Sequence, residues 1–155
     1  MAEALEWINA GRQFTFDDMV FWQGRGQEPF AAAAARIDTI VLGPHASAAF
    51  PAELQSFVAP ELTRRKQFDY SDVITSSLGR AWAQVDPKVV FVENPHSRLV
   101  LDGNREPPAD VGPGLRAFFA RLTRQRSGEK VGFGGVDAVR PITFSGEVVL
   151  PEPAS

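Results

Sequence analysis

Two short apolar runs, well apart in the chain, constrain the fold most. Residues 37–42 read IDTIVL and residues 88–92 read KVVFV. Runs of this kind are typical of strands covered on both faces. Between them, residues 72–83 repeat apolar residues at helical spacing behind Ser71, the expected N-cap. Alternating strands and helices predict an α/β fold with a mostly parallel sheet flanked by helices.

The rest of the chain adds weaker signals within one expected domain, residues 1–155. We expect residues 1–36 to be irregular with one short helix at the alanine run, residues 37–150 to form the sheet–helix core, and residues 151–155 to be a loose tail. Further expected elements are a helix opening at Pro51, a third strand over 98–102, a loop over 106–114, a helix over 114–124, a flexible connection at 132–135 and paired strands at 139–144 and 147–150.

Composition excludes several classes of protein. The 16 basic and 19 acidic residues give a net charge of -3, which argues against a broad nucleic-acid surface. No stretch approaches the roughly 20 apolar residues of a membrane span, and the start lacks the pattern of a secretory leader. The absence of cysteine removes disulfides, cysteine-ligated metals and cysteine nucleophiles. We therefore expect a cytoplasmic protein.

The chain has two histidines, His45 and His96, and each follows a proline. His45 comes directly after the first apolar run, where a buried strand delivers side chains to its carboxyl edge. A histidine there can bind a metal or move a proton. The alternative, a loop histidine bonded to backbone, weighs equally for His45 and more heavily for His96.

An acidic segment, FDYSD, places Asp69 and Asp72 just before the predicted helix. Either carboxylate could join a histidine in a mixed nitrogen and oxygen zinc site. Asp72 could instead serve only as a helix cap, and spacing alone favours that second interpretation.

A basic segment, SRLVLDGNRE, contains Arg98, Asn104 and Arg105. Arginine forks suit the bidentate binding of a carboxylate, and the Asn104 amide could add donors. Asp102 could orient either arginine. The alternative is an ordinary surface salt bridge. The motifs of serine hydrolases, dinucleotide-binding folds, P-loops and HExxH metalloproteases are all absent.

Three segments in order resemble the N-formylglutamate amidohydrolases. They are LGPHASAAFPAEL, FDYSDVITSSL and SRLVLDGNRE, across about residues 40–106, and VDAVRPITFSGEVVL resembles that family's middle region. The resemblance implies a phosphorylase/hydrolase-like α/β fold related to zinc carboxypeptidases. It also implies a zinc-dependent hydrolase that splits N-formyl-L-glutamate into formate and glutamate in histidine breakdown.

The resemblance also assigns residues. His45 matches the metal histidine, and Asp72 matches the acidic ligand better than Asp69 does. Arg98, Asn104 and Arg105 match the family's strand, and Asn104-Arg105 resembles the pair that grips the substrate carboxylate in carboxypeptidases.

The family carries a third metal ligand and a catalytic acid further along its chain. With Asp72 and His96 as the catalytic candidates here, either His96 completes the site locally or the site is incomplete.

Two other functions stay open. One is a non-catalytic or truncated domain of the same fold that binds a carboxylate-bearing small molecule. The other is a structural subunit that needs a partner chain to complete its sheet. The expected partner is a small molecule with carboxylate groups, with neither nucleic acid nor membrane involved, and a homo-oligomer is compatible with the sequence.

Overall fold

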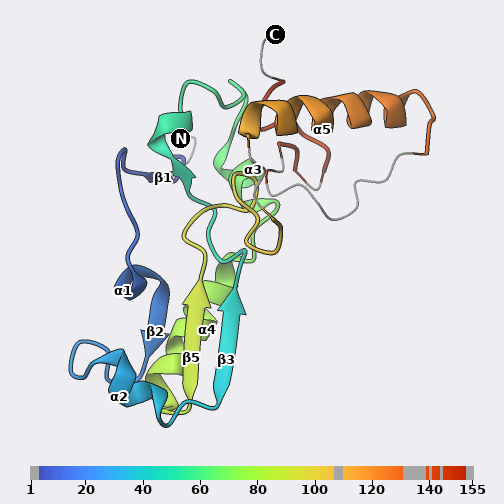
Figure 1. Ribbon diagram of the computed structural model, residues 1–155. Coiled ribbons are helices and arrows are strands. Elements are labelled where there is room, and N and C mark those ends of the chain that lie inside the picture. The colour runs from blue at the N-terminus through green and yellow to red at the C-terminus, as the bar shows by residue number, and fades with distance from the viewer. Residues whose placement is uncertain (1–3, 107–109, 131–138, 140, 144, 153–155) are drawn as a thin grey trace.

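The computed structural model describes residues 4–106, 110–130, 139, 141–143 and 145–152 (Figure 1). Its centre is a three-stranded sheet of order β2-β5-β3, formed by Val20–Trp22, Val89–Glu93 and Thr39–Gly43. β3 and β5 are parallel, and β2 is antiparallel to β5. A second sheet pairs β1 (Trp7–Ile8) with β4 (Phe50–Pro51) in parallel.

The α/β class is confirmed, but the prediction of a mostly parallel arrangement is corrected. The central sheet is mixed because the aromatic N-terminal segment supplies β2 as an antiparallel strand. That segment carried no clear periodicity, so its strand was missed. Trp22 is 6% exposed and packs with Phe30 at the start of α2 (Phe30–Ala34), which is the short helix expected at the alanine run.

The predicted strand–helix–strand unit is confirmed. Between β3 and β5 lies α4 (Val73–Val85), whose N-cap position is Asp72 rather than Ser71. Gly79 sets how closely α4 approaches the sheet, since a Cβ there would overlap the ring of Phe91 on β5. Ala83, one turn later, is fully buried. The face of α4 toward the sheet is therefore made of small residues.

The large apolar residues of α4 lie on its exposed side. Ile74, Leu78 and Trp82, part of the spacing that predicted the helix, are 72%, 65% and 48% exposed. The periodicity located the helix correctly but did not show which side is buried.

The remaining helices are short except for the last. They are α1 (Phe16–Met19), the 3-10 helix η1 (Ala52–Leu54), α3 (Arg64–Phe68) and α5 (Val111–Arg126). The helix expected at Pro51 is thus a single 3-10 turn. α5 begins inside the predicted loop because the Asp110 side chain accepts from Gly112 N at 3.0 Å, and Pro113 is tolerated in a first turn.

The predicted third strand over 98–102 is wrong. The chain forms a tight turn there, in which Ser97 O accepts from Val100 N at 2.9 Å and from Leu101 N at 3.0 Å. Leu99 is fully buried against Phe50 and Val149, so the turn is fixed by its own core contact.

The C-terminal segments are only partly described. Ile142 and Val148 form an antiparallel bridge, in agreement with the predicted pairing, and Gly146 has a φ of +79° in the turn between them. The predicted connection at 132–135 lies outside the described residues. No helix in the described part is long and apolar enough to cross a membrane.

Candidate functional site

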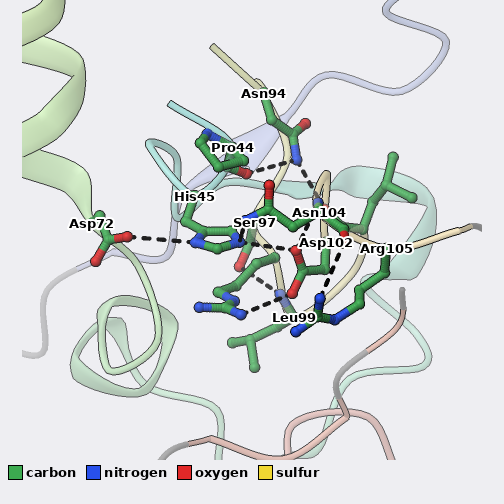
Figure 2. Close-up of polar contacts among 11 residues, drawn as sticks. Pro44, His45, Asp72, Asn94, Ser97, Leu99, Asp102, Asn104 and Arg105 are labelled. Atoms are coloured by element: carbon green, nitrogen blue, oxygen red, sulfur yellow. Dashed lines mark hydrogen bonds and ion pairs between the residues drawn. The ribbon is translucent and has the colours of Figure 1, made fainter. Parts of the chain in front are cut away.

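The site begins where the two parallel strands end. β3 ends at Gly43, whose carbonyl accepts from Asn94 N at 3.0 Å, and Asn94 directly follows β5. The Asn94 amide also donates to Pro44 O at 3.2 Å and to Leu101 O at 2.8 Å. These bonds fix the loop that presents His45, which is 8% exposed (Figure 2).

Asp102 holds the buried side of the His45 ring. Its Oδ1 lies 2.9 Å from His45 Nε2, and its carboxylate is fully buried. Arg98 Nη2 donates to Oδ2 at 2.8 Å, and Asn104 N donates to Oδ1 at 3.0 Å. Burial would raise the pKa of Asp102, but the hydrogen bonds from His45, Asn104 and Arg98 together lower it to about 2.

The ion pair of Asp102 with Arg98 decides the tautomer of the neutral histidine, because it keeps the carboxylate ionised. An ionised carboxylate is only an acceptor, so Nε2 must carry the proton and donate it to Asp102. The lone pair of Nδ1 is then directed to the other side. Such carboxylate–histidine pairs orient metal-binding histidines in proteins.

Asp72 faces the other nitrogen of the ring. Its Oδ2 lies 3.5 Å from His45 Nδ1, and its backbone N donates to His45 O at 2.8 Å. Although Asp72 occupies the N-cap position of α4, its side chain makes no capping hydrogen bond. The carboxylate and Nδ1 are both acceptors when the ring is neutral, so a proton or a cation between them is the favourable occupant.

Asp69, the other acidic candidate, is engaged elsewhere. Its Oδ2 accepts from Ser145 N at 3.1 Å and from Ser145 Oγ at 3.0 Å. The backbone hydrogen bond from Ser145 is the largest cause of its lowered pKa. The structure therefore brings Asp72, and not Asp69, against His45.

Arg98 and Arg105 have different surroundings. Arg98 pairs with Asp102, stacks over Tyr70 at 4.4 Å and leaves 17% of its side chain exposed. Arg105 Nη1 donates to Asn104 O at 3.2 Å. The buried Nε atoms of both arginines have no hydrogen-bond partner within the described residues, so the pairing of the Arg98 guanidinium with Asp102 is what distinguishes the two. Arg105 is thus the better placed of the two to bind an external carboxylate.

Asn104 lies between these groups. Its Nδ2 is 3.3 Å from His45 Nε2. Since Nε2 already donates to Asp102, the amide hydrogens of Asn104 are left for another acceptor. Figure 2 shows this side chain beside His45, Asp102 and Arg105.

His96 is not part of this cluster of contacts. Its ring packs edge-on against Phe14 with 5.4 Å between centroids, and its backbone N donates to Asn94 Oδ1 at 3.1 Å. Burial lowers the pKa of His96. The catalytic part predicted for it remains a prediction.

A cavity of about 620 Å³ adjoins the segments that carry His45 and Asp72. Ala46 and Ser47, which follow the histidine, and Val73, which follows the aspartate, all line it. Its volume suits a small organic ligand. Within the described part of the chain, no group of three or more histidines, aspartates or glutamates is arranged to hold a metal.

Sequence reasoning missed the contact between Asp102 and His45. It assigned Asp102 to the arginines, and the Arg98 contact is confirmed, but the histidine lies 57 residues away. The one available signal was a lone acidic residue after an apolar run in SRLVLDGNRE.

The comparisons with known proteins identify the family. The family model of N-formylglutamate amidohydrolase matches residues 37–153, which include every residue of the site. No curated protein and no solved structure matches the chain. Because the matched region covers most of the sequence, the chain belongs to the N-formylglutamate amidohydrolase family of hydrolases.

Proposed function

We propose that this chain is a cytoplasmic, zinc-dependent amidohydrolase that cleaves the C–N amide bond of N-formyl-L-glutamate or a similar N-acyl amino acid. The observation that carries the proposal is His45, whose Nε2 is held by the ionised Asp102 while Nδ1 faces Asp72. Family membership supports the amide-hydrolysing chemistry. The proposed fold is the phosphorylase/hydrolase-like arrangement related to zinc carboxypeptidases.

The two donors fit zinc as a pair. Ligands at 2.0–2.1 Å from a tetrahedral zinc lie about 3.3 Å apart. His45 Nδ1 and Asp72 Oδ2 are 3.5 Å apart, so a small movement would bring both to one ion. A neutral imidazole backed by a carboxylate and an exposed aspartate are donors that zinc accepts. The described residues supply two protein ligands, and a catalytic zinc generally has three.

The chemistry that zinc supplies in such a site is a water of lowered pKa and a polarised acyl oxygen. The chain's own contribution is orientation. Asp102 fixes the histidine tautomer, Arg98 keeps Asp102 ionised, and Asn104 N completes the set of donors. In this scheme Asp72 holds the metal and can accept a proton from the attacking water, and His96 is the second candidate for proton transfer.

Substrate binding falls to Arg105 and Asn104. The substrate carries carboxylates, the Asn104 amide is a donor beside His45, and the Arg105 guanidinium is a donor beside Asn104. Arg98 is proposed to act through Asp102, because its guanidinium is already paired there.

The proposal is tested by zinc content and affinity on protein purified without chelator. We expect about one zinc per chain, lost in His45→Ala and in Asp72→Asn. Asp69→Asn is the matched control, because Asp69 binds Ser145 instead of the histidine, and it should keep the metal. Hydrolysis of N-formyl-L-glutamate should follow the metal and stop on chelation.

Two results would reject parts of this scheme. Full zinc affinity in His45→Ala would place any metal elsewhere. Absence of zinc, together with calorimetric binding of N-formyl-L-glutamate that Arg105→Gln abolishes, would favour the alternative of a non-catalytic carboxylate-binding domain. The observation that favours a non-catalytic domain is that the described residues supply no third metal ligand.

A further inference from the structure

A second cavity, of about 660 Å³, lies where β2 ends, and its volume suits a small organic ligand. β2 is antiparallel to β5 and β3 is parallel to it, so β2 and β3 finish at opposite ends of the sheet. In Figure 1, β2 and the loop after it run toward α2, away from the tips of β3 and β5. Among the described residues that line this β2 cavity, none belongs to the contacts around His45.

The charged residues of the β2 cavity are mostly arginines. Arg25, Arg36 and Arg80 line it, and Glu28 is the single carboxylate among its described lining residues. Arg36 donates to Glu28 from both of its Nη atoms, so these two charges compensate each other. Arg25 and Arg80 therefore make the cavity electropositive, although the chain as a whole carries a net charge of -3.

Arg25 and Arg80 are both held at one aromatic ring. Their guanidinium carbons lie 4.5 Å and 4.2 Å from the ring centroid of Phe21 on β2. The two carbons cannot be farther apart than these distances added together, so one small molecule can reach both. Stacking on the ring orients a guanidinium plane and leaves its N–H edges free to donate.

The two arginines differ in how far their charge is compensated. Arg80 donates from Nε and Nη2 to the buried carboxylate of Glu93, which leaves Nη1 for another acceptor. Arg25 forms no ion pair with a described residue, and its Nη2 donates to the backbone oxygen of Asp17. An uncompensated guanidinium beside a cavity is the group that a carboxylate or a phosphate binds most strongly.

Three glutamines supply the other polar groups of the β2 cavity. Gln27 and Gln84 make no side-chain hydrogen bond within the described part of the chain, and both line the cavity. Gln23 donates to Val85 O at 3.4 Å, which leaves its amide oxygen as an acceptor. Each amide can donate and accept, so together they match hydroxyl groups, which also do both.

We propose that the β2 cavity binds a small hydroxylated organic anion, such as a sugar phosphate or a sugar acid. Arg25 binds the anionic group, Arg80 adds its remaining Nη1, and the glutamine amides bind the hydroxyls. An apolar ligand would bury these polar groups without partners, at a cost in free energy. A cationic ligand would be repelled by both arginines.

Calorimetric titration with four probes tests the site. Ribose 5-phosphate and gluconate carry a phosphate and a carboxylate on similar hydroxylated chains, and at least one should bind with a dissociation constant below about 1 mM. The probe that binds more tightly identifies the anionic group. Ribose has no charge and inorganic phosphate has no hydroxylated chain, so each should bind at least about tenfold more weakly than that probe.

Variants show where the anion binds. Arg25→Gln should weaken the tighter probe at least about tenfold, with cooperative unfolding retained because it breaks no ion pair among the described residues. Arg124→Gln is the matched control, since Arg124 is an exposed arginine of α5 paired with Glu129, and its affinity should equal that of the wild type. His45→Ala and Arg105→Gln should also bind the probe normally.

Three results would overturn the proposal. The first is that neither organic anion binds at concentrations up to about 10 mM. The second is equal affinity in Arg25→Gln and the wild type. The third is loss of binding in His45→Ala or Arg105→Gln, which would place the anion at the site of the histidine instead of the β2 cavity.

Discussion

Asp102 is the buried charge on which the site depends. Its carboxylate is fully buried and accepts from His45, Arg98 and Asn104 N. We expect Asp102→Asn to lower the free energy of unfolding by about 3 kcal/mol, since it leaves Arg98 without its partner. The same change should weaken zinc binding by roughly 10–100-fold, because the His45 tautomer is no longer fixed.

Urea unfolding and zinc titration measure these two effects. Asp38→Asn is the control, because Asp38 is an exposed aspartate whose ion pair with Lys88 is loose at 3.6 Å. It should change stability by less than about 0.5 kcal/mol. If Asp102→Asn behaved like this control, the network around His45 would not be the structural centre of the site.

The lowered pKa of Asp102 also predicts acid sensitivity. The carboxyl has a pKa of about 2 in the folded protein, against an ordinary value of 3.8 for an aspartate. Its contribution to stability is therefore complete above about pH 4 and lost as the pH falls through 2, an effect of about 2 kcal/mol. Metal-free wild type should lose this amount between pH 4 and 2, and metal-free Asp102→Asn should lack that component. Parallel acid curves for the two proteins would contradict the assignment.

Among single residues, the sequence identified His45 and Asp72 as candidates but did not predict that Asp102 contacts the histidine. His45 and Asp72 were found because one follows a strand and the other precedes a helix, and both positions are local. The contact from His45 to Asp102 spans 57 residues and depends on a turn that was predicted as a strand. A side chain's partner across such a distance is fixed by tertiary packing, which one sequence does not contain.

At the scale of elements, the packing of α4 on β5 depends on Gly79, which has no side chain. Gly79→Ala adds a methyl group that would overlap the Phe91 ring. The gain of about 1 kcal/mol in helix propensity should be outweighed by the overpacking, for a net loss of about 1–3 kcal/mol in the free energy of unfolding. Chemical denaturation gives this number directly.

A second glycine separates the two contributions. Gly112 lies in the first turn of α5, and a Cβ there would meet nothing closer than 3.6 Å. Gly112→Ala should be neutral or stabilise by up to about 1 kcal/mol. Stabilisation by Gly79→Ala as well would mean that α4 does not press on Phe91.

The elements also show where periodicity is informative. α4, β3 and β5 were predicted because their apolar residues are repeated or continuous. β2 was missed, since three residues in an aromatic segment give no period. The exposed residues of α4, Ile74, Leu78 and Trp82, show a different limit of periodicity. The spacing shows that apolar residues share a helix face, but not whether that face is buried.

For the whole molecule, the metal pair and the fold depend on each other. His45 lies just after the end of β3, and Asp72 lies at the start of α4. An ion held by both would therefore join two elements that are far apart in the unfolded chain. Binding to the folded state alone stabilises by about 2.7 kcal/mol at 100 times the dissociation constant. For a chain of this length we therefore expect zinc to raise Tm by roughly 5–10 °C.

Calorimetry with and without zinc measures that rise in Tm, and the variants show whether the ion binds at His45 and Asp72. His45→Ala and Asp72→Asn should unfold at the same temperature with and without the ion. Asp69→Asn should respond as the wild type does, because its carboxylate is bound to Ser145. An equal rise in all four proteins would show that zinc binds outside the site. No rise in any of them would show that His45 and Asp72, as held in this chain, do not form a zinc site, and Asp102 would then orient the histidine for a proton alone.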